Sequence, residues 1–335
     1  MFATLLGPLP RPPLPAGASL ARLVRAAVEA QDVAGLEPIT DGGLRHPRPT
    51  DALRGLGGLR PAADGALEAE AMPSWREPLT VDGWLETASF TERAVKQVLI
   101  GPYSAGCAIA AGGLDRTTLT LGLAEALNAE LRSLAAAGCL LVEIHEPAVV
   151  AIRARGVDWP LVAKAARRLL AGIDGLHVTL AITGGSPEPA GIPVIAATPF
   201  ASLAVDLIAG PDNWRLVSAT PRDRGVVVGA LSAVSGSDDG PELLLWALGY
   251  AASTNGRGAG RVGLATASGL ERLGWSEALA KLERLAEAVE LASREAADRV
   301  ARIDPRAIDI RSAASGRFRR GPGKADPNEP GRSSR

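Results

Sequence analysis

The sequence predicts an α/β protein built as one (β/α)8 TIM barrel. Its 335 residues suit one large barrel or two ordinary domains. Short apolar runs alternate with longer stretches of helical periodicity, which indicates βα units around a parallel sheet. Eight such runs occur, and eight strands close a barrel. The predicted strands are Thr4–Gly7, Leu36–Thr40, Gln97–Ile100, Cys139–His145, His177–Thr183, Ser202–Leu207, Gly225–Leu231 and Arg261–Ala265.

Helical patterns fill the intervals between these runs. The first, Ser19–Gln31, begins with a serine that suits a helix N-cap and repeats apolar residues at helical spacing. The same periodicity predicts helices over Thr117–Ala137, Pro160–Leu170, Pro241–Ser253 and Ser276–Val300. Each predicted helix follows or precedes a predicted strand, as a barrel requires.

One connection, over residues 43–96, is unusually long. It joins the second and third predicted strands, and its EPLTVDGWLE piece alternates in hydrophobicity, which predicts a short hairpin or an edge strand. Long connections at the C-terminal face of a barrel commonly carry function. We therefore expect this excursion to form a wall of the active site.

Composition sets limits on the partners and the compartment. The formal net charge is −1, so no global field attracts nucleic acid or a membrane surface. No apolar run approaches the roughly 20 residues that span a bilayer, and the N-terminus has no basic leader. Two cysteines make no disulfide framework, so we expect a cytoplasmic protein. We expect a barrel over residues 1–308 and a basic, Arg-rich disordered tail over 309–335.

Several landmarks follow one another in the order known from one enzyme family. They are TLLGPLPRP, LEPITDGGLRHPRP, VKQVLIGPYSAG, GCLLVEIHEPA, LHVTLAITGGS and RVGLATASGLERL, and they lie within residues 3–295. Together they resemble the cobalamin-independent methionine synthase family, whose fourth strand ends in Ile-Asp-Glu-Pro-Ala. The resemblance implies a barrel of the methionine synthase and uroporphyrinogen decarboxylase type.

The resemblance also implies an activity, namely methyl transfer from a methylated folate to a thiol such as homocysteine, in methionine biosynthesis. In catalytic members, zinc held by His, Cys, Glu and Cys lowers the pKa of the substrate thiol. The matching positions here are Ala181, Thr183, Asp206 and Ser268. Alanine has no donor atom and hydroxyls are weak zinc ligands, so we expect no such metal site and the loss of zinc-dependent thiol activation.

The remaining candidate for catalysis is His145, which takes the place of the family's aspartate before Glu-Pro-Ala. It ends the fourth predicted strand, where barrel enzymes place their chemistry. Glu146 adjoins it, and Glu143 lies two residues back on the same strand face. A histidine beside a carboxylate can act as a general acid or base near neutral pH. The alternative is a histidine that only hydrogen-bonds a backbone carbonyl at the rim.

Substrate-binding candidates follow the second, third and fifth predicted strands. Asp41 and Arg45 could bind polar groups of a ligand, or they could form a turn and pair with each other. Tyr103 and Ser104 could face the pocket, although packing or capping of the next helix explains them as well. Thr183 opens a TGGS segment, which could bind an anion or simply turn the chain.

Three functions stay open at this point. The first is a divergent methionine synthase-like methyltransferase, the second a non-catalytic barrel that binds a small ligand and works with a catalytic partner subunit. The third is a metal-free enzyme that uses His145 for acid–base chemistry. A rearranged metal site of His46, His145 and Asp206 is a further hypothesis, because two imidazoles and a carboxylate suit zinc or iron.

Overall fold

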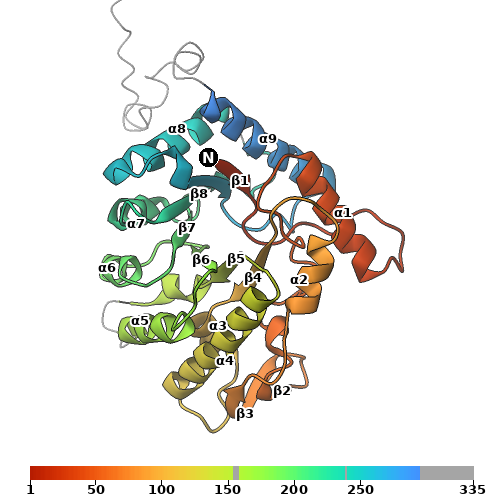
Figure 1. Ribbon diagram of the computed structural model, residues 1–335, viewed down its shortest axis with the longest axis vertical. Helices are drawn as coiled ribbons and strands as arrows, with labels where there is room; N and C mark the ends of the chain where they lie inside the picture. The colour runs from red at the N-terminus through yellow and green to blue at the C-terminus, as the bar shows by residue number, and fades with distance from the viewer. Residues whose placement is uncertain (154–157, 238–239, 295–335) are drawn as a thin grey trace, which may run out of the picture. The chain divides into compact units, whose positions relative to one another are not determined.

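We describe residues 1–153, 158–237 and 240–294 of a computed structural model of the chain. A parallel sheet of seven strands lies at its centre, in the order β1-β9-β8-β7-β6-β5-β4 (Figure 1). Every neighbouring pair is parallel, which confirms the βα architecture. The strands are β1 (Phe2–Thr4), β4 (Lys96–Ile100), β5 (Leu141–His145), β6 (His177–Ile182), β7 (Ser202–Asp206), β8 (Gly225–Leu231) and β9 (Val262–Thr266).

The sheet curls so that its two edge strands, β1 and β4, approach a common segment, residues 36–40. The Glu37 N–H donates to the carbonyl of Ala3 at 2.8 Å, and the Ile39 N–H donates to the carbonyl of Ala94 at 2.8 Å. Lys96 N–H donates back to the carbonyl of Ile39 at 2.9 Å. This segment contains only an isolated parallel bridge, Ile39 to Val95, in place of the predicted second strand.

Pro38 explains why the predicted strand over residues 36–40 is not regular. Proline has no N–H to give to a ladder, so it interrupts pairing in the middle of a sheet. The seven other predicted strands are present, each within a few residues of its predicted bounds. Seven parallel strands of a curled sheet are therefore observed, with an irregular segment between the two edges.

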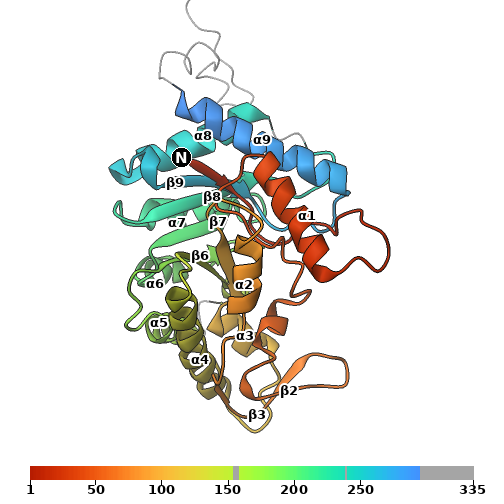
Figure 2. The ribbon, with the colours of Figure 1, turned by 45° about the vertical axis from the view of Figure 1, so that its right-hand side comes forward.

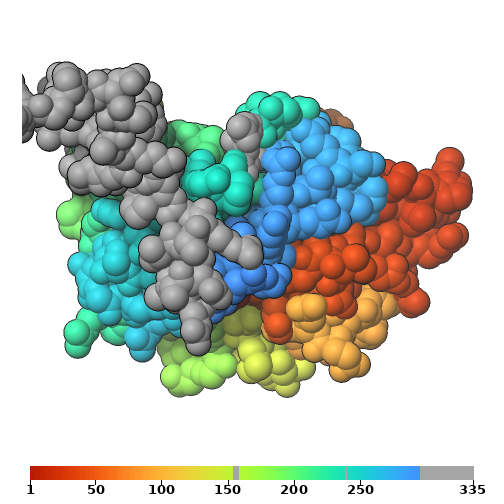
Figure 3. All heavy atoms as spheres, turned by 90° about the horizontal axis from the view of Figure 1, so that it is seen from above, coloured from red at the N-terminus to blue at the C-terminus, as the bar shows by residue number. Residues whose placement is uncertain are grey.

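Helices cover the outer side of the sheet, as Figures 1 and 2 show. Their inward faces carry leucine, valine and alanine that pack with the outward side chains of the strands in one continuous core. Helix α9 packs against β1 and α1, and Figure 3 shows it beside the N-terminal residues. The helices are α1 (Leu20–Val33), α2 (Val81–Ala88), α3 (Pro102–Ala108), α4 (Arg116–Ala136), α5 (Asp158–Leu169), α6 (Gly191–Ala196), α7 (Trp214–Ala219), α8 (Pro241–Ser253) and α9 (Trp275–Ser293).

The long excursion contains a hairpin, but not at the predicted place. An antiparallel pair, β2 (Gly57–Pro61) and β3 (Leu67–Ser74), extends beside α4 in Figure 2. The EPLTVDGWLE piece instead forms α2, so the predicted hairpin or edge strand there is wrong. Ten residues of alternation do not separate a strand from a short amphipathic helix, and the contacts of the preceding turn decide the matter.

Those contacts centre on one buried carboxylate, Glu130 of α4. It accepts hydrogen bonds from the indole of Trp75 at 2.9 Å, from the Leu79 N–H at 2.8 Å and from the Thr80 N–H at 2.8 Å. The Thr80 hydroxyl adds a fourth, at 2.7 Å. Because Thr80 stands just before α2, Glu130 fixes where that helix begins and fastens the excursion to α4.

In the part of the chain that the structure describes, no helix is both long and apolar enough to cross a membrane. Residues 1–293 form one compact unit. The predicted tail, residues 309–335, and the predicted barrel boundary at residue 308 lie outside the described residues.

Candidate functional site

A pocket of about 410 Å³ lies at the carboxyl ends of the strands. His145 ends β5, Ile100 ends β4, and Thr183 and Ser268 follow β6 and β9. All four line the pocket because parallel strands bring their carboxyl ends to the same edge of the sheet. Other polar residues complete the lining, namely Thr40, Asp41, His46, Gln97 and Glu271.

A chain of charged and polar groups runs inward from His145. The imidazole Nε2 lies 2.6 Å from Glu143 Oε1, and the ammonium of Lys96 donates to Glu143 Oε2, also at 2.6 Å. Lys96 donates a further hydrogen bond to the carbonyl of Leu5 at 2.8 Å. Glu143 and His145 share a face because side chains alternate along β5. The predicted proximity of this histidine and carboxylate is therefore present.

The electrostatics of the chain depend on Glu143, which is buried. Burial raises the pKa of its carboxyl group, but the Lys96 ammonium and the hydrogen bond from His145 outweigh burial and hold the pKa at about 2. An ionised carboxylate only accepts hydrogen bonds, so Nε2 of His145 must carry the proton. In the neutral imidazole, the lone pair is then on Nδ1, where a proton of a bound molecule could be accepted.

Glu146, three residues further on, has a different surrounding. It is buried behind the pocket and accepts hydrogen bonds from the Tyr103 N–H at 3.0 Å and the Ser104 N–H at 2.6 Å. Burial raises the pKa of its carboxyl group to about 7, although these hydrogen bonds oppose the shift. Glu146 does not line the pocket, so its placement supports the first turn of α3.

The residues predicted after the second strand take two different places. Asp41 lines the pocket and accepts the Gly43 N–H at 2.8 Å, as the alternative of a simple turn predicts. Arg45 does not line it, because its guanidinium pairs with Glu86 at 2.6 Å and lies 3.9 Å from Asp41. His46 lines the pocket, and burial lowers the pKa of its imidazole despite the opposing charge of Asp41.

Tyr103 and Ser104 lie in the first turn of α3, and neither lines the pocket. Both are buried, and the Ser104 hydroxyl accepts a hydrogen bond from the Ala148 N–H at 3.0 Å. The structure places neither hydroxyl in this pocket, but Ser104 lines an adjoining cavity of about 650 Å³ that shares Ile100 and Pro147 with it. Proline at position 102 starts α3 at once, which turns both residues into its packing and capping.

The four positions at which the resemblance expects zinc ligands do not suit that metal. Ala181 has no donor atom and is buried among apolar side chains. Asp206 uses its carboxylate to accept the N–H groups of Gly184 at 3.0 Å, Ile208 at 2.9 Å and Ala209 at 2.8 Å. Thr183 and Ser268 line the pocket but offer only hydroxyls. This donor set cannot replace two thiolates, an imidazole and a carboxylate.

The position of Asp206 also argues against a rearranged metal site of His46, His145 and Asp206. His46 and His145 line the pocket, whereas Asp206 does not and is fully engaged by the backbone around it. Across residues 1–153, 158–237 and 240–294, no three His, Cys, Asp or Glu side chains gather as a metal site would require.

Lys96, which joins His145 and Glu143 in this chain of polar groups, was not among the predicted site residues. It opens β4 and is buried, whereas the sequence analysis begins this strand at Gln97 and leaves Lys96 at the end of the long excursion. The available signal was a lysine in a buried strand, since a buried cation needs a partner. Its partner Glu143 is on the next strand, and the sequence does not reveal that pairing.

Comparisons with known proteins support the fold. No protein-family model matches the chain, and no curated protein matches it. Among solved structures, the chain is similar to a B12-independent methionine synthase from Shewanella sp. W3-18-1 in complex with selenomethionine, with a TM-score of 0.72 and 18% identity over 86% of this chain and 96% of that one.

Two further solved structures are similar. A putative vitamin-B12 independent methionine synthase from Listeria monocytogenes has a TM-score of 0.72 and 14% identity, over 88% of this chain and 98% of that one. A methyltransferase from Methanosarcina mazei has a TM-score of 0.53 and 15% identity, over 81% and 84%. At these identities the likeness establishes the fold, and it confirms that the chain resembles methionine synthases of this type in structure.

Proposed function

We propose that the pocket at the carboxyl ends of the strands binds a small molecule and that His145 is the acid–base group that acts on it, without zinc. The observation that carries the proposal is the buried Lys96–Glu143–His145 chain, which ends in the pocket. A carboxylate that fixes the tautomer of an imidazole is a recurrent arrangement in acid–base catalysis.

The pocket size supports a small ligand. A volume of about 410 Å³ lies within the range of sites for small molecules. Asp41 and Glu271 line it, and among the described residues no lysine or arginine does, so a ligand with a positively charged or hydrogen-donating group fits its charge. The presence of a catalytically suited histidine favours turnover over simple binding.

Methyl transfer to a thiol is the second candidate, and the fold likeness to two methionine synthases favours it. Under this candidate, activation of the thiol would fall to His145, because a free thiol with a pKa near 8.5 is mostly protonated at neutral pH. A methylated folate as the donor stays a prediction. So does a non-catalytic barrel with a catalytic partner subunit.

We also propose that the sheet closes as an eight-stranded barrel, with residues 36–40 in the eighth position. Support comes from the hydrogen bonds of this segment to β1 on one side, and to Ala94 and Lys96 at the start of β4 on the other. The interruption at Pro38 would then be local, and the barrel interior would stay continuous.

The experiment begins with binding. Homocysteine, methionine and 5-methyltetrahydrofolate are added to the protein, and the imidazole signals of its three histidines are followed by nuclear magnetic resonance. Ligands of this pocket should shift the signals of His46 and His145 and should bind equally after treatment with a chelator. The protein is then incubated with zinc and dialysed to remove unbound metal, and elemental analysis should find far less than one zinc per chain.

Turnover is tested next with each ligand that binds. Bound ligands are incubated in deuterated water, and exchange at their acidic carbon–hydrogen bonds and methyl transfer to the thiol are measured. If the wild-type protein turns a ligand over and the His145→Gln variant binds that ligand without turnover, acid–base chemistry at His145 is supported. Binding without any turnover would replace the proposal by the non-catalytic barrel, and stoichiometric zinc that stimulates methyl transfer would refute it.

A further inference from the structure

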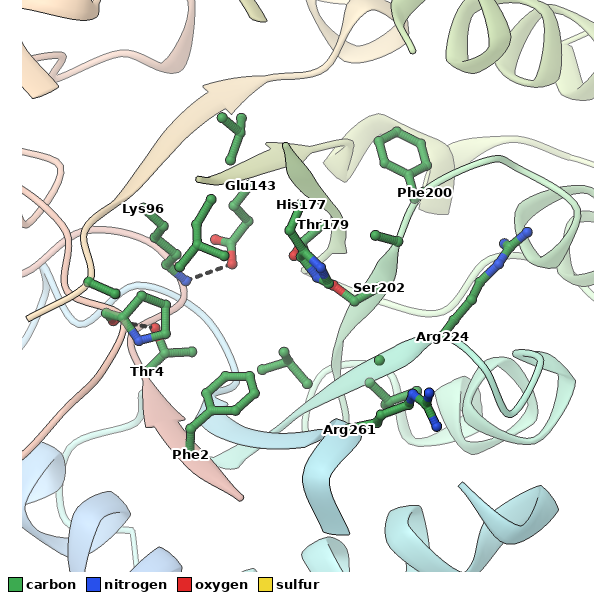
Figure 4. Close-up of a pocket in the computed structure, with 18 of the residues that line it drawn as sticks. Phe2, Thr4, Lys96, Glu143, His177, Thr179, Phe200, Ser202, Arg224 and Arg261 are labelled. Atoms are coloured by element: carbon green, nitrogen blue, oxygen red, sulfur yellow. Dashed lines mark hydrogen bonds and ion pairs between the residues drawn. The ribbon is translucent and has the colours of Figure 1, made fainter. Parts of the chain in front are cut away.

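A second cavity, of about 840 Å³, opens at the amino ends of the strands, opposite the proposed site. Its lining includes the first residues of six strands, among them Phe2 of β1, Lys96 of β4, His177 of β6 and Ser202 of β7. Figure 4 shows these side chains converging on one space. We call this space the amino-end cavity.

Three polar side chains form one group inside it. Ser202 Oγ lies 2.9 Å from His177 Nε2 and 2.7 Å from Thr179 Oγ1. Figure 4 shows the three together, drawn from the neighbouring strands β6 and β7. Hydroxyls and an imidazole both donate and accept hydrogen bonds, so this group can pair with a hydroxyl or an amide of a ligand.

A second polar feature lies at the inner end. Lys96 and Glu143 line the cavity and are joined by the ion pair drawn in Figure 4. The ammonium has three N–H donors, and Leu5 and Glu143 take two of them. Among the described residues no acceptor is seen for the third, so it is available to an acceptor atom in the cavity.

The charge of the lining is balanced. Three cationic and three anionic side chains surround the cavity, so neither an anion nor a cation gains from the net field. The Arg224 guanidinium donates hydrogen bonds to the backbone carbonyls of Ala196, at 3.0 Å, and Thr198. The six are Lys96, Arg224, Arg261, Glu37, Glu143 and Asp223.

Apolar side chains make up most of the remaining wall. Phe2 presents an aromatic ring and Pro38 and Leu141 add aliphatic surface, whereas Phe200 and Val226 are almost fully buried in the wall. Aromatic rings gain from packing against a flat apolar body. An open apolar cavity with a few convergent polar groups is typical of a small-molecule site.

We propose that the amino-end cavity is a second ligand site, for an uncharged molecule with a flat apolar body and one hydroxyl or amide group. The hydroxyl or amide pairs with the group of His177, Thr179 and Ser202, and the apolar body lies against Phe2, Pro38 and Leu141. This site is separate from the pocket at the carboxyl ends, and its test does not depend on what binds there.

The histidines make the test specific, because each cavity has its own. His177 lines the amino-end cavity, while His46 and His145 line the other pocket. The probe is 2-naphthylmethanol, compared with 2-naphthoate and 2-naphthylmethylammonium, which carry the same ring system with opposite charges. Histidine signals are followed by nuclear magnetic resonance in the full-length protein, and His177→Gln assigns the His177 signal.

We expect 2-naphthylmethanol to shift the His177 signal alone, with a dissociation constant about tenfold lower than either charged analogue. Thr179→Val removes one hydroxyl at constant shape and should weaken binding about fivefold, the effect of one hydrogen bond. Thr183→Val makes the same change beside the other pocket and should leave the affinity unchanged. Ala201→Trp should fill the cavity and abolish binding.

Several results would overturn the proposal. Shifts of His46 and His145 without His177 would place the probe in the other pocket. No shift at millimolar probe, or equal losses in Thr179→Val and Thr183→Val, would show that the cavity is not the site. Charged analogues that bind as tightly as the alcohol would reject the uncharged ligand class. Thermal unfolding of each variant confirms folding, and Ser202→Ala replaces Ala201→Trp if the latter does not fold.

Discussion

Two halves of the sheet interior differ sharply. Along β4 and β5 the inward side chains form the buried chain Lys96–Glu143–His145. Along β6 to β9 and just after β1, beyond the polar group of His177, Thr179 and Ser202 at the amino ends, inward side chains pack as one buried apolar cluster of Leu6, Ala181, Ala204, Val227 and Ala265. The backbone is the same parallel ladder on both sides.

The difference separates the strands that carry the proposed acid–base group from those that form the apolar cluster. Burying a polar group is unfavourable unless the group is paired, and in the β4–β5 half Glu143 pairs with both Lys96 and His145. The buried cluster in the opposite half consists of apolar side chains, and Ala181, at a position where the resemblance expects a metal ligand, belongs to it. The proposed chemistry at His145 should therefore respond to changes in the polar half, and changes in the apolar cluster should alter stability alone.

The largest expected effect comes from breaking the ion pair. Lys96→Met leaves Glu143 buried with His145 as its only partner, and we expect the free energy of unfolding to fall by about 3–5 kcal/mol. Urea unfolding measures it. The double variant Lys96→Met/Glu143→Leu should recover most of the loss, because both charges are gone. A cost below about 1 kcal/mol for the single variant would show that the pair is not effectively buried.

The next effect concerns Glu146, a buried carboxyl group in the polar half without a cation. Its pKa of about 7 lies above its ordinary value of 4.5. The unfolded chain therefore loses this proton first, and its contribution to stability declines as pH rises from about 4.5 to about 7, by about 3 kcal/mol. Unfolding at several pH values should show this decline, and Glu146→Gln should remove it.

Glu143 provides the opposite case in the same series. Its pKa, held at about 2, lies below its ordinary value of 4.5, so its stabilising contribution is present above pH 4.5 and is lost as pH falls toward 2. Glu146→Gln should leave this acid limb intact. If the Glu146→Gln variant lost both the decline at low pH and the decline between pH 4.5 and 7, the two carboxyl groups would titrate as one unit.

A smaller effect is expected in the apolar half. Ala265→Leu adds volume to a fully buried cluster, and we expect a loss of about 1–3 kcal/mol. Ala136→Leu, at the exposed end of α4, is the matched control and should change stability by less than about 0.5 kcal/mol. Ligand binding in the pocket at the carboxyl ends should be the same in both. If Ala265→Leu alone weakened that binding, the functional separation of the halves would be wrong.

The smallest stability effect is expected at His145 itself. Its side chain is 16% exposed, so water can replace its hydrogen bond to Glu143 in the variant His145→Gln. We expect a loss of about 1 kcal/mol or less in urea unfolding. A loss as large as that of Lys96→Met would mean that His145 serves the fold, and its proposed chemistry would lose its support.

The sequence predicted those parts of the fold that local pattern determines. Gly225–Leu231 was found at its true bounds, because a continuous apolar run between turns has few alternatives in a parallel sheet. Residues 36–40 do not form a regular strand because Pro38 has no N–H to donate. The proline is visible in the sequence, but the eight apolar runs favoured the prediction of eight strands. The helix α2 was missed because its start depends on Glu130, some 50 residues away.

The site was predictable in the same measure. Alternation along one strand was enough to place Glu143 beneath His145. Lys96 could not be placed, since the pairing of β4 with β5 is a tertiary fact. Tyr103 and Ser104 were expected in the pocket because strand ends usually lead there, but their N–H groups instead bind Glu146.

The pairing of β1 with β9 has a consequence for how the protein is made. Phe2 is the register partner of Gly263, and the Leu6 N–H binds the hydroxyl of Thr266 across 260 residues of sequence. During synthesis β1 therefore waits for β9, about 260 residues later, before it gains this neighbour. Contacts of such separation slow folding, and the early strand edge stays open to wrong partners in the meantime. We expect β1 to be the last strand to become protected when hydrogen exchange is pulsed during refolding.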